Sequence, residues 1–237
     1  SQARLMVIDR RRGTIAHDRF VNVGRYLPPG GVLVRNNSRV VPARLLGVKT
    51  RSNGRVEIFL LRRLAGGRTY EVLMRPTSKI RDGDEIQFPG SPLRARVLDV
   101  ARRLVTFEGD LRDELERIGH MPLPPYIRRQ DTGSDRADYQ TVYARHRGSV
   151  AAPTAGLHFT RPLLDELAAA GQQVLDVTLH VNYGTFKPIE ESDITRHQMH
   201  REQYSISERT LAALAAARRA RRPITAVGTT SCRVLES

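Results

Sequence analysis

The spacing of hydrophobic and polar residues changes along the chain and separates a β-rich part from an α/β part. Between about residues 42 and 107, short apolar runs recur between clusters of turn residues. Apolar and polar positions alternate in Arg55–Ile58 and in Leu93–Val97, the pattern of strands with one buried face. Many short strands at regular spacing predict a small barrel or sandwich.

Toward the C-terminus the apolar positions indicate strands that alternate with helices. The runs Val174–Val181 and Ile224–Val227 each predict a strand. A helix is expected between Thr160 and Gly171, because threonine is an N-cap residue, a proline stands in the first turn and glycine ends helices. A second helix is expected over 207–222. This alternation predicts an α/β layer with some parallel pairing.

Shorter patterns mark the two borders of the β-rich part. Residues 4–10 and 31–35 predict strands before it, and Asn36-Asn37-Ser38 suits a turn or a helix N-cap. Three prolines in 120–129 predict an extended linker after it. We therefore expect an α/β (α+β-like mixed) main domain with an inserted small β-barrel domain. The main domain would comprise 1–41 and 130–237, and the barrel with its proline-rich linker 42–129.

Composition narrows the class of protein. With 237 residues, 40% of them hydrophobic, the chain can bury a core. No run approaches the roughly 20 apolar residues of a membrane helix, and residues 1–12 lack the apolar segment of a secretory signal. The single cysteine, Cys232, excludes a disulfide scaffold and a four-cysteine zinc site, and we expect it to be a small buried residue. We expect a soluble, cytoplasmic protein.

The positive charge is concentrated in the first half of the chain. Residues 1–130 hold 26 Lys and Arg against 13 Asp and Glu, a net charge of +13, whereas residues 131–237 hold 13 against 12, a net charge of +1. A one-sided basic field indicates a polyanionic partner. Of the 39 basic residues 36 are arginine, which is also typical of a GC-rich genome. That bias should act on both halves, so the asymmetry favours a nucleic acid.

Two loops of small residues lie between predicted strands and helices. Residues 151–160 (AAPTAGLHFT) and 226–231 (AVGTTS) can present backbone N–H groups to an anion. Open α/β sheets bind ligands at such strand ends. The first loop could equally be a close-packed turn, and the second could simply cap the next helix. The second loop is neither a Walker A loop nor a dinucleotide fingerprint.

Histidines supply the candidate acid and base groups. His180 ends a predicted strand next to a glycine loop, where it could act as an acid or base or be a satisfied structural residue. His197, His200 and Glu202 form H-x-x-H-x-E, which would place both histidines on one helix face. This is not the H-E-x-x-H zinc spacing, and we expect no metal. Serine hydrolysis lacks its G-x-S-x-G elbow.

Longer runs resemble a known family over essentially the whole chain. They are Asn36–Arg44 (NNSRVVPAR), Ile118–Ile127 (IGHMPLPPYI), Tyr139–Ala144 (YQTVYA), Gly148–Thr160 (GSVAAPTAGLHFT), Thr178–Pro188 (TLHVNYGTFKP), His197–Glu202 (HQMHRE) and Ala226–Ser237 (AVGTTSCRVLES). With these runs the chain closely resembles the S-adenosylmethionine:tRNA ribosyltransferase-isomerases of queuosine biosynthesis. The family fold, an α/β domain with an inserted β-barrel, agrees with the pattern found above.

The resemblance implies a transferase. Such an enzyme moves the ribosyl part of S-adenosylmethionine onto 7-aminomethyl-7-deazaguanine in a tRNA anticodon and isomerises it, giving epoxyqueuosine-tRNA, adenine and methionine. It implies no cofactor, with S-adenosylmethionine as co-substrate, and the partners are that tRNA and S-adenosylmethionine, with no membrane. We expect a monomer.

The chemistry needs a base beside the sulfonium, a proton donor for adenine and a holder for the methionyl carboxylate. The expected catalytic residues are His158, His180, His197, His200 and Glu202. Substrate binding is expected from Pro153, Thr154, Ala155, Gly156, Gly184, Thr185, Phe186, Gly228, Thr229, Thr230, Ser231 and Arg233. Candidate tRNA contacts are Arg39, Arg44, Arg62, Arg63 and Arg75.

Two departures from the family leave an alternative open. Family members run beyond the Val-Leu-Glu-Ser end with a T-N-F-H-L-P stretch that this sequence does not contain, so we expect the α/β domain to lack its C-terminal part. Asn182 stands where the family more often has glycine. The alternative is a catalytically inactive fragment or a tRNA-binding module. An ordinary methyltransferase is a weaker third hypothesis, because the G-x-G loop after a first strand is absent.

Overall fold

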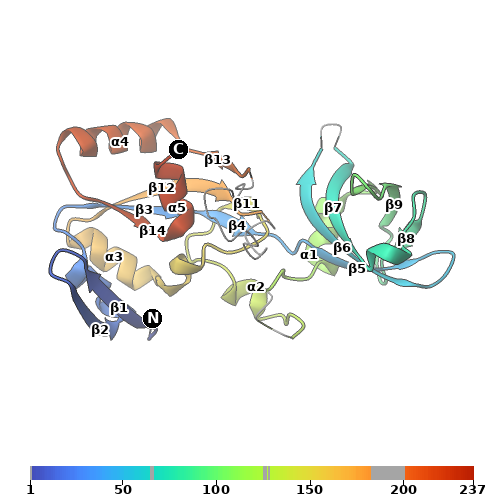
Figure 1. Cartoon of the computed structure of the whole chain (residues 1–237), viewed down its shortest axis with the longest axis horizontal. Coiled ribbons are helices and arrows are strands. Elements are labelled where there is room, and N and C mark those ends of the chain that lie inside the picture. Colours follow the sequence, from blue (N-terminus) through green and yellow to red (C-terminus); the bar gives the residue numbers. More distant parts are fainter. Residues whose placement is uncertain (1, 65–66, 125–126, 128, 183–200) are drawn as a thin grey trace. The chain divides into compact units, whose positions relative to one another are not determined.

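The computed structural model describes residues 2–64, 67–124, 127, 129–182 and 201–237 (Figure 1). The strands are β1 Arg4–Asp9, β2 Thr14–Arg19, β3 Val32–Asn36, β4 Ser38–Val40, β5 Arg44–Lys49, β6 Arg55–Arg63, β7 Thr69–Arg75, β8 Glu85–Gln87, β9 Arg94–Asp99, β10 Leu104–Glu108, β11 His146–Ser149, β12 Gln173–His180, β13 Gln203–Ser205 and β14 Ile224–Val227. The helices are α1 Leu111–Ile118, α2 Asp135–Asp138, α3 Arg161–Ala169, α4 Glu208–Arg219 and α5 Gly228–Leu235, with 3-10 turns η1 Phe20–Tyr26, η2 Thr77–Lys79 and η3 Thr154–His158.

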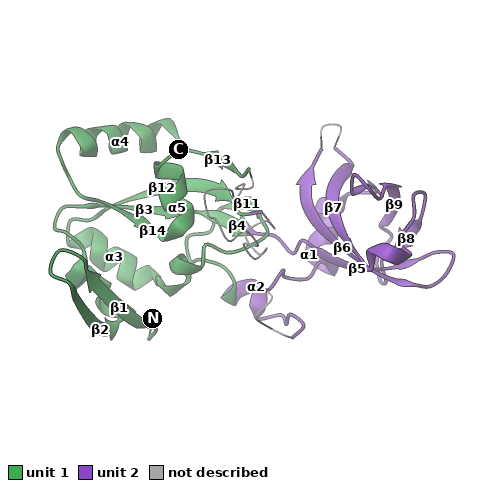
Figure 2. Cartoon of the chain, in the orientation of Figure 1, with its two compact units in different colours: residues 1–39, 138–181, 198–237 green, residues 40–137, 182–197 purple. Residues whose placement is uncertain are grey.

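The chain divides into two compact units (Figure 2). Unit 1 comprises 1–39, 138–181 and 198–237, and unit 2 comprises 40–137 and 182–197. The domains expected from the sequence had borders at 41/42 and 129/130. That division into domains remains a prediction.

Unit 2 contains a closed barrel with the strand order β10-β7-β6-β5-β8-β9. The alternation seen in the sequence decides which side chains fill it. Val56 and Ile58 of β6 are 3% and 0% exposed, and Ala95 and Val97 of β9 are each 1% exposed, whereas their charged neighbours face outward. The expected α/β fold with an inserted β-barrel is therefore confirmed, since the barrel strands lie in sequence between β3 and β12 of unit 1.

Unit 1 is built on a four-stranded sheet with the order β13-β12-β3-β14. Both β12 and β14 run parallel to β3, and β13 is antiparallel to β12. Figure 1 shows α3 and α4 on opposite sides of this sheet. On the α3 side, Leu163, Leu164 and Leu167 pack with Leu33 of β3 and Val227 of β14. The parallel sheet thus has the buried faces that such sheets require.

The helices begin and end where the capping residues indicated. The hydroxyl of Thr160 accepts the Leu163 N–H at 3.4 Å, and that of Ser207 accepts the Thr210 N–H at 3.2 Å. Gly171, just past α3, has φ +85°, a conformation that glycine adopts without strain. Local capping chemistry therefore fixed these boundaries.

The Asn36–Ser38 turn was a wrong prediction. Asn36 ends β3, and Ser38 begins β4, which pairs with β11. The error arose because the side chains of these residues bond to strands more than 100 residues away, as described below. The predicted strand near the N-terminus is β1, which pairs with β2 as a separate two-stranded ribbon. Among the described residues, no helix is long and apolar enough to cross a membrane.

Candidate active site

The carboxyl ends of three parallel strands meet at one edge of the unit 1 sheet. Beyond β3 lie Asn37 and Ser38, beyond β12 lies Val181, and β14 leads directly into α5. Because β12 and β14 flank β3 on opposite sides, their connections diverge at this edge. Open α/β sheets bind ligands at such a point. A ligand site is therefore expected at this edge.

A buried asparagine joins the ends of β3 and β12. The side chain of Asn36 is fully buried; its Oδ1 accepts the N–H of Leu179 at 3.0 Å and its Nδ2 donates to the carbonyl of Leu179 at 3.0 Å. The main-chain pairing of the two strands ends at Val177 opposite Asn36, so the amide takes the place of a further backbone pair. Asn36 thereby fixes the peptide that precedes His180.

Ser149 holds the other side of the same strand end. Its fully buried hydroxyl accepts the N–H of Val181 at 2.9 Å and donates to the carbonyl of Ala151 at 3.0 Å. Gly148 has φ +142°, and a Cβ there would lie 2.9 Å from Nδ1 of His180. The glycine therefore leaves the room that the imidazole ring occupies.

His180 is half-buried at this edge, and its Nδ1 has no hydrogen-bond partner among the described residues. Burial lowers the pKa of His180 from its ordinary value, and the charge of His146 lowers it further. The ring is consequently held neutral near pH 7. A neutral imidazole can accept a proton, as a general base must.

A tyrosine, a glycine and a threonine form a second buried group. A Cβ at Gly156 of η3 would collide with the hydroxyl of Tyr143 and with Cγ2 of Thr141. The guanidinium carbon of Arg35 lies 4.1 Å from the centre of the Tyr143 ring, and Arg35 itself is bonded to Asp176 at 2.6 Å. Burial raises the pKa of Tyr143, so its hydroxyl stays protonated and can donate.

The start of α5 lies against the η3 loop. Gly228 has φ +80°, and a Cβ there would lie 3.1 Å from Cβ of Ala155. Val227, the N-cap residue, supplies no side-chain hydrogen bond. Val227 therefore leaves the N–H groups of the first turn uncapped, and the positive end of the helix dipole favours an anionic acceptor there. The structure thus brings together the two small-residue loops that the sequence singled out.

Five buried side-chain atoms in the described part of the chain have no hydrogen-bond partner. They are Thr141 Oγ1, Tyr143 OH, His180 Nδ1, Thr230 Oγ1 and Ser231 Oγ, and all five belong to unit 1. Buried polar atoms in native proteins are nearly always bonded. Such a group at the carboxyl edge of a sheet is the arrangement of a polar ligand site, in which the ligand or ordered water supplies the partners.

The remaining predicted residues lie in different surroundings. His158 is exposed, and its ring centre lies 5.3 Å from that of Phe20. The carboxylate of Glu202 is 2.5 Å from Arg233 Nη1, and the Glu202 side chain is buried. This ion pair ties the segment before β13 to α5, so these two side chains are engaged with each other. Thr229 is exposed at the start of α5.

Some of the predicted site residues lie outside the described residues. They are Gly184, Thr185, Phe186, His197 and His200. Within the described ranges, no three His, Cys, Asp or Glu side chains gather to hold a metal ion. Cys232 was expected to be buried but is exposed, because α5 packs through Ser231 and Val234 instead.

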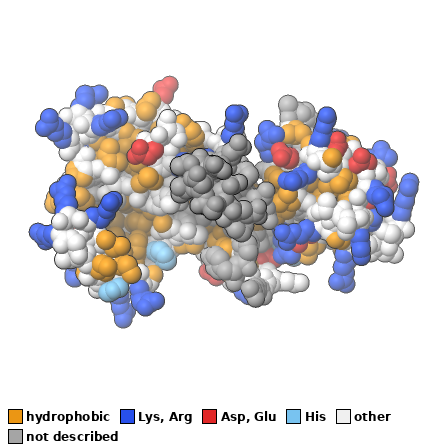
Figure 3. All heavy atoms as spheres, in the orientation of Figure 1, with side chains coloured by type: hydrophobic (Ala, Val, Ile, Leu, Met, Phe, Trp, Pro, Cys, Tyr) orange, Lys and Arg blue, Asp and Glu red, His pale blue; other side chains and the backbone are white. Residues whose placement is uncertain are grey.

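The arginines proposed to contact tRNA differ in how they are held. Arg44 is 2.8 Å from Glu57, Arg62 is 3.1 Å from Glu71, and Arg63 donates to the carbonyl of Gly67 at 2.8 Å. Arg39 and Arg75 are exposed. Figure 3 shows basic side chains on the visible face of both units.

Residue-by-residue reasoning missed four members of this edge. Thr141, Tyr143, Asn36 and Gly148 were each part of a run that carried the family resemblance, yet none was assigned a role. The available signals were the T-x-Y spacing of Thr141 and Tyr143 and the consecutive asparagines at 36 and 37. Their partners lie far away in sequence, so the pattern alone could not assign them.

Comparison with known proteins adds an independent line of evidence. A family model described as "Queuosine biosynthesis protein" matches residues 1–237. The S-adenosylmethionine:tRNA ribosyltransferase-isomerase of Acetivibrio thermocellus is 45% identical over 240 residues, covering 99% of this chain and 70% of that relative. The protein of the same name from Symbiobacterium thermophilum is 48% identical over 240 residues, with the same coverage. A crystal structure of S-adenosylmethionine tRNA ribosyltransferase from Thermotoga maritima is 28% identical, with a TM-score of 0.42, covering 99% of this chain and 65% of that one.

Proposed function

The chain belongs to the queuosine biosynthesis protein family, and from that premise we propose that it is an S-adenosylmethionine:tRNA ribosyltransferase-isomerase. It transfers the ribosyl part of S-adenosylmethionine to 7-aminomethyl-7-deazaguanine in tRNA and isomerises it, forming epoxyqueuosine-tRNA and releasing adenine and methionine. The single observation that carries the assignment to the unit 1 edge is its group of five buried polar atoms that have no hydrogen-bond partner among the described residues.

The methionyl carboxylate of S-adenosylmethionine fits the start of α5. Uncapped N–H groups and the helix dipole favour an anion there, and the hydroxyls of Thr230 and Ser231 lie in the same turn. The adjoining η3 loop supplies Pro153, Thr154, Ala155 and Gly156 as the wall. We assign the hydroxyl of Tyr143 as a further donor to the bound substrate, because burial keeps it protonated and no described residue bonds to it.

We assign His180 as the general base of the proposed reaction. Proton removal from the ribosyl carbon beside the sulfonium needs an unprotonated base, and burial favours the neutral, unprotonated form of this imidazole. Asn36 and Ser149 bond to the main chain on the two sides of His180, and Gly148 leaves room for its ring. His158, His197, His200 and Glu202 remain proposals for the proton donor to adenine, as do Gly184, Thr185, Phe186, Gly228, Thr229 and Arg233 for substrate contacts.

The tRNA fits the basic part of the chain. Of the net charge of +14, residues 1–130 carry +13, and phosphates attract such a surface. Arg39, Arg44, Arg62, Arg63 and Arg75 are the proposed phosphate contacts. We propose that the protein acts in the cytoplasm as a monomer, with S-adenosylmethionine as co-substrate.

Product analysis tests the proposed reaction. The protein is incubated with S-adenosylmethionine and with tRNA that either carries or lacks 7-aminomethyl-7-deazaguanine, and small molecules are measured by mass spectrometry. Free adenine and methionine in equal amounts, formed only with the modified tRNA, are the expected result. Binding of tRNA without release of adenine would instead identify a binding module.

A further inference from the structure

The outer surface of the barrel carries a row of side chains that the proposed reaction does not use. In the sheet register, Arg55 of β6 lies opposite Val48 of β5, Val48 lies opposite Gln87 of β8, and Gln87 lies opposite Arg94 of β9. Residues directly opposite each other in antiparallel strands point to the same face. That face is the outside of the barrel, because the adjacent residues are buried, as Ile86 shows with 1% exposure.

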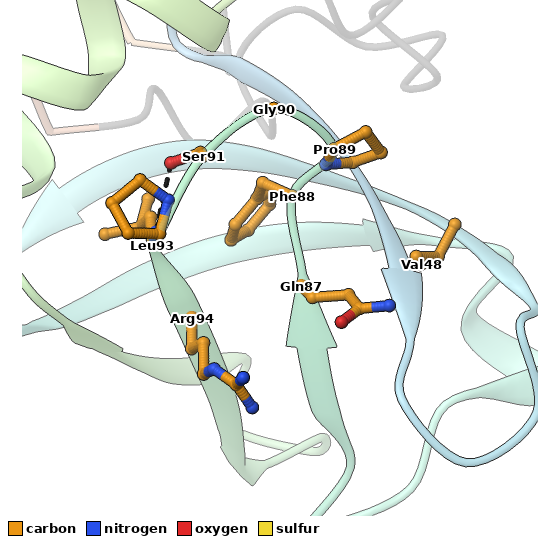
Figure 4. Close-up of a pocket in the computed structure, with 9 residues that line it drawn as sticks. Val48, Gln87, Phe88, Pro89, Gly90, Ser91, Leu93 and Arg94 are labelled. Carbon is orange, nitrogen blue, oxygen red and sulfur yellow. Dashed lines mark hydrogen bonds between the residues drawn. The ribbon is translucent and has the colours of Figure 1, made fainter.

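A pocket of about 400 Å³ opens at the end of this row, where the loop between β8 and β9 turns over the barrel (Figure 4). Its walls are Val48, Gln87, Arg94 and the loop 88–93, whose prolines Pro89 and Pro92 are apolar. Pockets for small organic ligands have volumes of about 300–1,000 Å³ and combine apolar walls with a few polar groups. This volume and lining fit one nucleotide.

The loop that forms the wall is held by α1. Ser91 accepts the N–H of Leu93 at 3.0 Å, and its hydroxyl donates to Glu114 at 2.5 Å. Arg117 pairs with Glu114 at 2.5 Å and also donates to the carbonyl of Gly90. A binding wall fixed in this way loses little entropy when it takes up a ligand.

Gln87 and Arg94 of the pocket, and Arg55 at the far end of the row, have polar side chains that are available to a ligand. Within the described part of the chain, these three side chains form no hydrogen bond or ion pair. Glu108 lies opposite Arg94 in the register of β9 and β10, but the two form no ion pair. An amide that can both donate and accept, with a guanidinium on either side, matches the edge of a base and its neighbouring phosphates.

We propose that this pocket, which we call the barrel pocket, binds an unpaired ribonucleotide of the tRNA other than the reacting base. The inference rests on the proposed function in taking tRNA as the substrate. The base lies against Val48, Pro89 and Pro92, Gln87 bonds its edge, and Arg94 and Arg55 contact the phosphates on either side. Single-stranded RNA is recognised in this way, through splayed bases held on protein surfaces.

Equilibrium binding of a fluorescein-labelled tRNA transcript, measured by anisotropy at several salt concentrations, tests the barrel pocket. Arg94→Gln is expected to raise the Kd about tenfold and to lower the slope of log Kd against log salt by about one, as loss of one phosphate contact does. Gln87→Leu is expected to raise the Kd several-fold without changing that slope, because it removes a neutral contact. Arg102→Gln, an exposed arginine at the opposite end of β9, is the matched control and should change the Kd less than twofold.

The outcomes separate this inference from the proposed function. Equal losses for Arg94→Gln and Arg102→Gln, with no effect of Gln87→Leu, would show a diffuse charge effect and overturn the barrel pocket. An unchanged Kd for tRNA in all three variants would also overturn the proposal that the barrel pocket binds a ribonucleotide, and would favour a protein ligand instead. Adenine release by the unchanged protein is measured in parallel, so failure of the proposed reaction is seen separately from failure of the pocket.

Discussion

The side-chain amide of Asn36 pairs with the peptide of Leu179 in both directions, accepting its N–H and donating to its carbonyl at 3.0 Å each. The side chain of Asn36 thus replaces the backbone partner that Leu179 of β12 would have in a longer β3, beyond the last main-chain pair of the two strands. The arrangement fixes the approach of β12 to the site edge, where His180 follows.

Replacing that amide should cost stability. Asn36→Leu removes the side-chain partner of the Leu179 N–H, the Leu179 carbonyl and the Ser38 N–H, and an unsatisfied buried group costs about 1–3 kcal/mol. We expect the free energy of unfolding in urea to fall by about 3 kcal/mol. Asn22→Ala is the control, since Asn22 makes a single part-buried bond to Asp18 and should cost less than about 1 kcal/mol. Equal losses of unfolding free energy in the two variants would show that the hydrogen bonds of Asn36 to Leu179 stabilise the fold no more than the single bond of Asn22.

Gly156 should be intolerant of a methyl group because of Tyr143. A Cβ at this position meets the tyrosine hydroxyl, so Gly156→Ala is expected to lose about 1–3 kcal/mol of stability through overpacking. The double variant Gly156→Ala with Tyr143→Phe removes the colliding oxygen and should recover a large part of that loss. Thermal unfolding of the four proteins measures the coupling, and strictly additive effects would contradict the contact.

Tyr143→Phe alone separates binding from folding. The hydroxyl has no partner among the described residues, so its removal should change stability by less than about 0.5 kcal/mol. If the hydroxyl donates to bound substrate, the Kd for S-adenosylmethionine should rise about tenfold, as loss of a hydrogen bond to a charged group does. Titration calorimetry gives this value. An unchanged Kd would remove Tyr143 from the substrate site.

The pH dependence of stability and of kcat/KM should reflect the titration of His180. Its pKa lies below the ordinary value of 6.5, chiefly through burial, so the folded protein binds this proton less readily than the unfolded chain. The ring therefore contributes stability that is present above pH 6.5 and is lost as the pH falls through the folded value. If the neutral ring is the base, kcat/KM should fall over the same acid range, with a midpoint below 6.5.

The matched pair for this prediction is His180→Gln and His17→Gln. His17 is exposed on β2, which pairs with β1 in a separate two-stranded sheet. We expect His180→Gln to lose activity at least about a hundredfold, in the range of general base catalysis, and His17→Gln to keep the profile of the unchanged protein. If kcat/KM of His180→Gln still falls toward acid pH with the same midpoint, another group causes that fall.

The sequence predicts those features that depend on neighbours in the chain. Alternation placed Val56 and Ile58 inside the barrel, and local capping placed the start of α3 at Thr160. The site edge depends on partners that are far apart, such as Asn36 and Leu179, which are 143 residues apart. No local pattern contains such a pairing, and Asn36 was therefore read as part of a turn.

The same reasoning explains the partial success at the site. The two small-residue loops were predicted because strand-to-helix turns have a local signature, and the structure brings them into contact through Ala155 and Gly228. The exposure of Cys232 was not predictable in this way, because which face of α5 is buried depends on the sheet beneath it. His180 was found as a strand-end histidine, whereas Gly148, which leaves room for its ring, was not.

The fate of two isotopic labels tests the central claim most directly. S-adenosylmethionine labelled in the ribosyl carbons and S-adenosylmethionine labelled in the methyl group are each incubated with the protein and the modified tRNA, and acid-precipitable label is counted. Ribosyl transfer predicts ribosyl label in the tRNA and methyl label in free methionine. Methyl label in the tRNA would show a methyltransferase, and the absence of both labels from tRNA that remains bound would show a binding module; either result would contradict the account.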